Sequence, residues 1–199
     1  MLDSDIEARR LKFKVGRVKE HWYRNCLGVG LSQGFIEPLE ATALDMVQET
    51  VVRFIEAANK GNMTDEFRDE FNTRISGRFD AVRDYIVCHY RINTRTDTPY
   101  WIDAGQNEKI SQSLREILTA WIKGQNITDE LERQKLDAYF PNISWNCLLA
   151  GKGILPTDDQ VRPGNELANK YDLDDIARFR KGCALNFPAH KDQLAELRH

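Results

Sequence analysis

The first third of the chain changes from alternating apolar and polar residues to helical spacing. Over residues 10–16, Leu11, Phe13 and Val15 fall on one face and basic residues on the other, which is the period-two pattern of a half-buried strand. The short apolar run at 26–31 has the length of a strand and is bounded by turn-forming residues. We therefore predict a small β element at the N-terminal side.

The remainder has apolar residues three or four positions apart, as in amphipathic helices. Pro38 is tolerated in a first helical turn, where its missing N–H would have no partner, and the helix it opens should run to about Asn59 and stop at Gly61. Residues 64–92 predict one long helix, or two helices broken near Gly77. Further helices are predicted at 108–123, at 128–140 and on either side of Pro188.

The pattern as a whole predicts a mainly α fold with that small β element. Because no internal repeat, low-complexity tract or linker interrupts it, we expect residues 1–199 to form a single unit. A chain of this length, 41% hydrophobic, can bury roughly 70% of its unfolded surface.

Charge and hydropathy narrow the partners and the compartment. The net charge of −3, from 28 basic and 31 acidic residues, provides no positive field for nucleic acid. No apolar run reaches the roughly 18 residues of a membrane span, and the first residues lack the apolar core of a signal peptide. We expect a soluble, cytoplasmic protein without a membrane partner.

Cysteine and histidine spacing gives no indication of a metal site. The four cysteines lie far apart, each in apolar company, so we predict buried free thiols rather than zinc ligands or disulfides. The four histidines have no ligand spacing either. We assign no metal. The cysteines are Cys26, Cys88, Cys147 and Cys183.

The glycine-rich segment at 28–34 has the wrong spacing for a dinucleotide-binding G-x-G-x-x-G fingerprint. What it predicts is a flexible turn that brings Gly34, Phe35 and the amides of a helix N-terminus to an anionic or polar group.

Two carboxylates follow that turn and have two interpretations. Glu37 and Glu40 stand at a predicted helix start, where acidic residues commonly cap free N–H groups. The alternative is that one of them faces a cavity as a general base or an orienting group. The aromatic residues at 99–101 and 140–145 are similarly open between a ligand pocket and core packing.

Four segments, taken in order, resemble the flavin-dependent halogenases of the tryptophan-halogenase family. They are N25-C-L-G-V-G-L-S-Q-G-F-I-E-P-L-E-A-T, F71-N to R83-D-Y-I-V-C-H-Y, D97-T-P-Y-W and W145-N-C-L-L-A-G-K-G-I-L-P. The resemblance implies the C-terminal helical substrate-domain portion of a flavin monooxygenase-like α+β enzyme. Residues 1–36 would end the flavin-domain sheet and its turn, and 37–199 would form the helical substrate region.

In this family, reduced FAD and oxygen convert chloride or bromide to hypohalous acid, which travels to a separate substrate chamber. A lysine and a glutamate receive it there. By position in E-P-L-E, the resemblance makes Glu40 catalytic: it would orient the halogenating species and stabilise positive charge on the aromatic substrate. Glu37 would be mainly structural.

The resemblance also implies the residues that contact cofactor, halide and substrate. Thr42 and Ala43 stand where backbone amides are associated with halide, and Trp145 and Asn146 where tryptophan-specific members tend to carry a tyrosine pair. The substrate is then an indole, a phenol or a carrier-bound aromatic. The positions expected to contact flavin are Gly34, Phe35, Pro38 and Leu39.

The family's FAD fingerprint, its catalytic lysine and its W-x-W-x-I-P motif are not found in this sequence. We therefore expect most of the FAD to be held by a separate N-terminal half, with a flavin reductase as a further partner, and this chain to be inactive alone. The alternative is a non-catalytic helical relic or interaction module derived from a halogenase. An upstream reading frame carrying the fingerprint would favour the enzyme.

Overall fold

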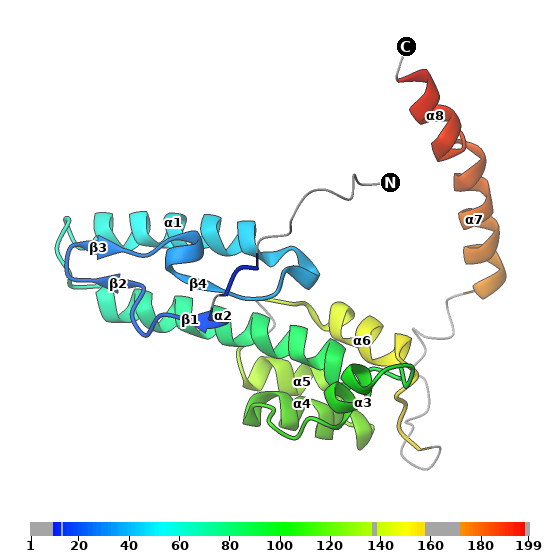
Figure 1. Cartoon of the computed structure of the whole chain (residues 1–199), viewed down its shortest axis with the longest axis horizontal. Helices are drawn as coiled ribbons and strands as arrows, with labels where there is room; N and C mark the ends of the chain where they lie inside the picture. Colours follow the sequence, from blue (N-terminus) through cyan, green and yellow to red (C-terminus); the bar gives the residue numbers. More distant parts are fainter. Residues whose placement is uncertain (1–9, 13, 137–138, 158–171, 198–199) are drawn as a thin grey trace. The chain divides into compact units, whose positions relative to one another are not determined.

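The computed structural model describes residues 10–12, 14–136, 139–157 and 172–197. The chain divides into two compact units, Met1–Thr157 and Asp158–His199, and each is described by itself. The first unit is mainly helical with short strands (Figure 1), which confirms the predicted fold class. Its elements are β1 (Gly16–Arg17), β2 (Trp22–Tyr23), β3 (Cys26–Leu27), the 3-10 helices η1 (Gly30–Ser32) and η2 (Pro38–Glu40), β4 (Gly34–Phe35), and helices α1 (Thr42–Lys60), α2 (Arg68–Arg91), α3 (Pro99–Gln106), α4 (Gln112–Ile122), α5 (Ile127–Arg133) and α6 (Asn142–Gly151).

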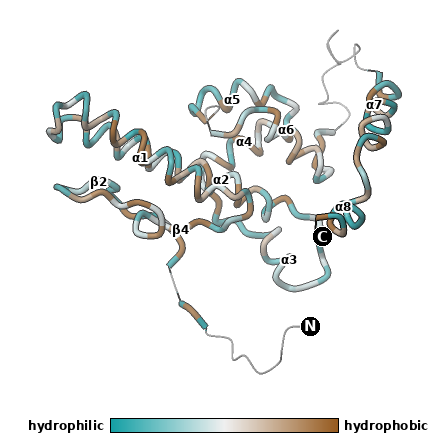
Figure 2. Tube along the Cα trace, turned by 90° about the horizontal axis from the view of Figure 1, so that it is seen from above, coloured by the Kyte–Doolittle hydropathy of each residue, from teal (hydrophilic) through white to brown (hydrophobic). Residues whose placement is uncertain are grey.

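Helix α2 is the element on which the rest of the first unit packs. It continues unbroken through Gly77, so the one-helix alternative for this segment is confirmed. Its N-terminal part packs against α1 and strand β2, and its C-terminal part against α3 and α4. The amphipathic pattern that allows this is visible along both long helices in Figure 2.

Two hydrophobic clusters share α2. The first joins the N-terminal part of α2 to α1 and the β2–β3 hairpin, and the second joins its C-terminal part to α4, α5 and α6. Fully burying one large aliphatic or aromatic side chain stabilises a fold by roughly 1.5–3 kcal/mol, so these clusters dominate its stability. The first is Trp22, Met46, Phe71, Ile75, Phe79, Val82 and Ile86; the second is Tyr85, Cys88, Ile92, Leu114, Ile117, Ile127, Leu131, Trp145, Leu148 and Leu149.

Asn72 fastens the β2–β3 hairpin to α2. Its buried side chain accepts hydrogen bonds from the backbone N–H groups of His21 (2.9 Å) and Trp22 (2.8 Å), and donates one to the Trp22 carbonyl (2.9 Å). A hairpin with two-residue strands is marginal by itself. These three bonds therefore give the hairpin a fixed place on the helix.

Asp84 fastens α4 to α2 in a comparable way. The buried carboxylate accepts hydrogen bonds from the Arg83 guanidinium (2.8 and 3.0 Å) and from the Ser111 hydroxyl (2.6 Å). Ser111 is also the N-cap of α4, since its oxygen accepts from the Leu114 N–H at 2.9 Å. The buried charge is thus both paired and hydrogen-bonded, the condition for tolerating it in a protein interior.

The strands are shorter than predicted. Among the described residues of 10–16, only Gly16 lies in a strand, which pairs antiparallel with β4 in the register Gly16↔Phe35; β2 pairs antiparallel with β3. At 26–31 the strand ends at Leu27 and a 3-10 turn begins at Gly30. Leu11 and Val15 are largely exposed, so the alternating pattern has no apolar layer to pack against in the described part of the chain.

The helix predictions are mostly confirmed, with several differences. The helix predicted to open at Pro38 begins as α1 only at Thr42, because η2 and the left-handed residue Ala41 precede it. Helix α1 ends at Lys60 with Gly61 as its C-cap, and the second unit holds α7 (Leu173–Leu185) and α8 (His190–Glu196) on either side of Pro188. The helix predicted at 128–140 ends at Arg133, and α3 and α6 occupy segments without a predicted helix. The helix predicted at 64–92 begins at Arg68 with Phe67 as its N-cap, and the Thr64 hydroxyl before it donates to the Gly61 carbonyl.

The cysteines are free thiols, but only Cys88 is buried, and burial raises its pKa to about 12. Cys26 and Cys147 are exposed and Cys183 is half-buried, so the prediction of four buried thiols is wrong for these three. Apolar sequence neighbours did not ensure burial, because Cys147 lies on the outer side of α6. Of the helices described, none is long and apolar enough to cross a membrane.

We expect Asn72→Ala to destabilise the fold by about 3 kcal/mol, because it leaves two N–H groups and one carbonyl without partners near the core. Denaturant unfolding of the variant measures this. The matched control is Asn59→Ala on the exposed side of α1, which should change the free energy of unfolding by less than about 0.5 kcal/mol. Equal effects of the two substitutions would contradict the role of Asn72.

His21 gives the fold a predictable dependence on pH. Its imidazole is 1% exposed and stacks on Phe79 at 5.3 Å between ring centroids. Burial, helped by the positive charge of Arg17 and opposed by Asp80, lowers its pKa from 6.5 to about 4. Between these two pKa values the unfolded chain binds a proton that the folded chain excludes. The free energy of unfolding therefore has its full value above about pH 6.5 and decreases as the pH falls towards 4.

We expect the loss to be on the order of 3 kcal/mol across that window. The measurement is the free energy of unfolding at several pH values for the parent and for His21→Leu, which should lack this component. The exposed His190 supplies the control, since His190→Leu should keep the parent slope. Identical slopes for the parent and His21→Leu would show that His21 is not the responsible group.

Candidate active site

The segment E37-P-L-E-A-T changes direction at a single residue. Pro38 begins η2, the Ala41 N–H donates to the Pro38 carbonyl at 3.0 Å, and Ala41 itself is left-handed (φ 52°, ψ 27°) before α1 starts at Thr42. A left-handed backbone costs an alanine roughly 1–2 kcal/mol, so neighbouring contacts must maintain it. The result is that Glu40 lies directly before the first turn of α1.

Glu40 is held by a histidine from the far end of α2. Its Oε1 lies 2.9 Å from Nε2 of His89, and Nδ1 of His89 lies 2.9 Å from the backbone carbonyl oxygen of Tyr85, one turn earlier. The Glu40 side chain is 36% exposed and the His89 side chain 18%. The carboxylate is therefore fixed by one contact and remains accessible.

Glu37 is held by the next residue of the same helix. The Tyr90 hydroxyl donates a hydrogen bond to its Oε1, and burial, together with this carboxylate, raises the pKa of the Tyr90 phenol. Neither η2 nor α1 has a side-chain cap. The interpretation of Glu37 and Glu40 as helix caps is therefore wrong, since both carboxylates bind α2 instead.

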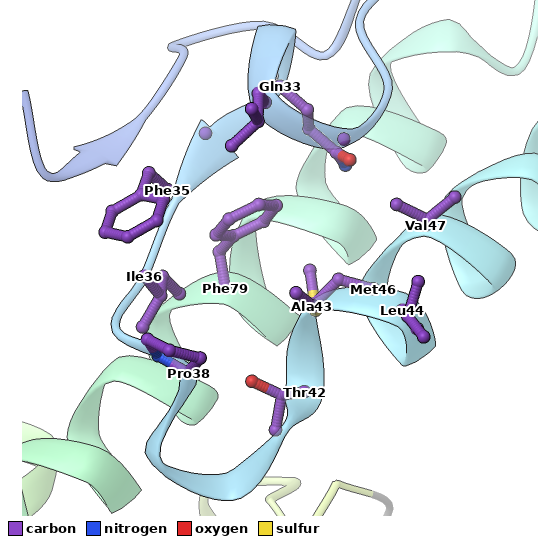
Figure 3. Close-up of a pocket in the computed structure, with 13 residues that line it drawn as sticks. Gln33, Phe35, Ile36, Pro38, Thr42, Ala43, Leu44, Met46, Val47 and Phe79 are labelled. Atoms are coloured by element: carbon purple, nitrogen blue, oxygen red, sulfur yellow. The ribbon is translucent and has the colours of Figure 1, made fainter. Parts of the chain in front are cut away.

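A cavity of about 250 Å³ lies beside this segment. In Figure 3, Phe35, Ile36 and Pro38 form one side of it, and Met46, Val47 and Leu44 from α1 the other. The wall is mostly apolar. The positions expected to contact cofactor or halide that line it are Gly34, Phe35, Pro38, Thr42 and Ala43, whereas Leu39 and Glu40 are not among its lining residues.

Polar groups meet the cavity at two places. The buried amide of Gln33 lines it and donates from Nε2 to the Thr50 hydroxyl at 2.6 Å, which fixes its orientation. At the other place, Thr42 and Ala43 begin the 19-residue helix α1, and the N–H groups of a first turn have no intrahelical acceptors. The helix dipole adds partial positive charge there, so the arrangement fits a small anion.

Gly34 has a steric reason to be glycine. A Cβ built on it would lie 2.7 Å from the Gly16 carbonyl oxygen and 2.9 Å from the Arg17 Cα, both backbone atoms of β1. The absence of a side chain therefore lets β1 and β4 pair next to the cavity. At Gly34, the glycine is therefore needed for the close approach of two backbone segments, whereas the sequence suggested that it made a turn flexible.

A second, more open cavity of about 400 Å³ is lined by His89 and by residues of α6. Tyr85 crosses it to α6, where its hydroxyl donates to the Ser144 carbonyl at 3.2 Å. Burial, with the negative charge of Glu40 contributing, raises the pKa of Tyr85 to about 12. Its lining residues are Tyr85, His89, Ile143, Ser144, Cys147 and Leu148.

The two positions expected to contact substrate are near this cavity but do not line it. Trp145 is 2% exposed and packs edge-on against Tyr85, 4.8 Å between ring centroids, and Asn146 is half-buried. Sequence reasoning did not identify His89, Tyr85 or Ser144 as site residues. The H-Y pair ends the segment R83-D-Y-I-V-C-H-Y, but nothing in the neighbouring sequence indicates that its partners are two glutamates about 50 positions away.

Comparison with known proteins identifies the family. A sequence model of tryptophan halogenases matches residues 1–165. The chain belongs to the tryptophan halogenase family. Among curated halogenases, it is 28% identical to the 7-chloro-L-tryptophan 6-halogenase KtzR of Kutzneria sp. (strain 744), over 98% of this chain and 38% of KtzR. It is 31% identical to the tryptophan 6-halogenase ThaL of Streptomyces albogriseolus, over 78% of this chain and 31% of ThaL.

Solved halogenase structures have the same fold. BrvH, a flavin-dependent halogenase from Brevundimonas sp. BAL3, superimposes with a TM-score of 0.70 at 29% identity, over 97% of this chain and 38% of BrvH. The chain thus spans about a third of the length of the halogenases that it matches.

Proposed function

We propose that this chain is the C-terminal part of a flavin-dependent halogenase that chlorinates or brominates an indole- or phenol-like aromatic substrate, and that it needs an FAD-binding half to act. The observation that carries the proposal is the placement of Glu40. Its accessible carboxylate is held by His89, two residues before the amides of Thr42.

The chain's own residues fit an anion and a planar apolar group side by side. When bound, reduced flavin with oxygen would supply the oxidation that converts halide to hypohalous acid. Gly34, Phe35, Pro38 and Leu39 would contact the flavin, with three of the four already lining the apolar cavity. The amides of Thr42 and Ala43 would contact the halide.

Glu40 would act at the substitution step. The aromatic carbon forms a bond to the halogen, the halogen–oxygen bond breaks, and the ring loses its proton while the hydroxyl group leaves as water. A carboxylate beside the ring orients the halogenating species and stabilises the positive charge that develops before the proton leaves. Its accessible, singly held state suits that role.

The substrate would contact the α6 side of His89. Trp145 and Asn146 remain our proposed substrate positions, Trp145 acting through the wall it supports, because its ring is buried against Tyr85. The aromatic compounds named for the relatives, such as 7-chloro-L-tryptophan for KtzR, support an aromatic substrate class. A separate flavin reductase would provide reduced flavin.

We expect the chain alone to bind FAD only weakly, because the pyrophosphate of a dinucleotide is held by a glycine-rich turn that this sequence lacks. Fluorescence titration of FAD with the 199-residue chain measures the affinity. A dissociation constant near or below about 1 μM would contradict the need for an FAD-binding half.

We expect Glu40→Gln to lower halogenated product by about 10²-fold or more, in the chain combined with a matching FAD-binding half, because it removes a positioned charge but keeps the side-chain size. Flavin oxidation should continue, so hypohalous acid would still form but would rarely halogenate the substrate. Product and flavin oxidation are measured together by chromatography and absorbance.

The matched control is Glu37→Gln. It weakens the hydrogen bond from Tyr90 and should cost roughly 1 kcal/mol of stability, with turnover near that of the parent. If Glu40→Gln halogenates as well as the parent while Glu37→Gln does not, the two roles are reversed.

A further inference from the structure

We propose that His89 is a positioning residue for the halogenation step: it holds one oxygen of Glu40 and leaves the other for the halogenating species. This inference rests on the proposed function. It is carried by the geometry of three residues on two elements, Glu40 at the end of η2 and Tyr85 and His89 on α2.

The two ring nitrogens of His89 have different partners. Nδ1 lies 2.9 Å from the Tyr85 backbone carbonyl, which can only accept, so Nδ1 must carry a proton. Nε2 lies 2.9 Å from Oε1 of Glu40, within ion-pair distance of the carboxylate. The ring therefore presents Nδ1 to the backbone of α2 and Nε2 to Glu40, so that the helix fixes the nitrogen that faces the carboxylate.

The ring itself is held rigidly. It contacts Tyr85 edge-on at 5.0 Å between centroids, and Tyr85 stacks on Phe140 at 3.8 Å and donates to the Ser144 carbonyl. The Tyr85 carbonyl that receives Nδ1 is one helical turn earlier on α2. His89 thus transmits the fixed position of α2 and α6 to a carboxylate on a short 3-10 turn.

The second carboxylate oxygen is the functional part of this arrangement. Within the described residues, Oε1 of Glu40 has a partner and Oε2 has none, and the side chain is 36% exposed. A carboxylate fixed through one oxygen keeps its other lone pairs directed at a constant place. Preorganised groups of this kind act mainly on the rate of the chemical step, not on substrate affinity.

The first test uses NMR on the intact 199-residue chain, without flavin. We expect a downfield ring N–H proton from His89 that is absent in His89→Gln, moves upfield in Glu40→Gln, and is unchanged in Glu37→Gln. The pairing would be overturned if the chemical shift of this proton did not change in Glu40→Gln, or if it changed equally in Glu37→Gln.

The second test measures turnover of the chain combined with an FAD-binding half. His89→Leu should lower kcat on the order of 10- to 100-fold while KM for the aromatic substrate changes less than about 3-fold. His89→Gln should recover most of that loss, because its amide N–H can donate to Glu40 from a similar position. Thermal unfolding of each variant accompanies the kinetics, and the glutamine variant keeps the test valid if the leucine variant folds poorly.

The pair should also be non-additive. The double variant His89→Leu/Glu40→Gln should be no slower than Glu40→Gln alone, since His89 acts only through that carboxylate. The positioning role would be overturned if the fold-losses of the two single variants multiplied in the double variant. It would also be overturned if His89→Gln were as slow as His89→Leu, or if His89→Leu were as fast as the parent. If the parent combination makes no halogenated product, the proposed function fails and the positioning role with it, while the NMR result decides the pairing separately.

Discussion

The burial of α2 between two hydrophobic clusters constrains everything else in the first unit. Once Ile75 and Phe79 face one cluster and Cys88 and Ile92 face the other, the helix can neither rotate nor slide. A shift of one residue would turn every side chain by about 100°. The polar residues of α2 therefore occupy fixed places, and each fastens a different neighbour.

Four polar residues of α2, spread along the helix, each hold a different neighbouring residue or segment. Asn72 holds the β2–β3 hairpin, Asp84 holds the start of α4, and His89 and Tyr90 hold the two glutamates of E-P-L-E. From Asn72 to Tyr90 the helix rises roughly 27 Å at 1.5 Å per residue. Helix α2 thus positions segments that have few contacts with one another. The two glutamates are held in place by this buried helix and not by the short 3-10 turn on which they lie.

The sequence was informative where structure is local. The C-terminal end of α1 and the two helices around Pro188 follow from spacing and from helix-stop residues, and the mainly α class follows from the helical spacing as a whole. The start of α1 at Thr42 and the continuity of α2 through Gly77 did not follow from these signals. It also indicated Thr42, Ala43, Phe35 and Gly34 as neighbours of one site, which the cavity brings together. Whether these residues bind halide and flavin stays a prediction.

What the sequence did not give depends on contacts between distant segments. Capping and partner binding both favour a glutamate near a helix start, and only the position of His89 and Tyr90 separates them. The sequence left Trp145 open between a pocket residue and a core residue, and its edge-on contact with Tyr85 shows that its ring is packed in the core. The alternation at 10–16 predicted a longer strand because periodicity does not say whether an apolar layer is there to receive it.

The left-handed residue Ala41 has a consequence for how such a protein can diversify. Because it joins η2 rigidly to α1, the carboxylate of Glu40 and the first amides of α1 keep one mutual geometry, and neither can be adjusted without the other. Under the proposed function, a new substrate shape would then be accommodated on the α6 wall, formed by Ile143, Ser144 and Cys147. We expect substitutions that adapt the protein to fall on that wall, while the E-P-L-E-A-T segment stays constant.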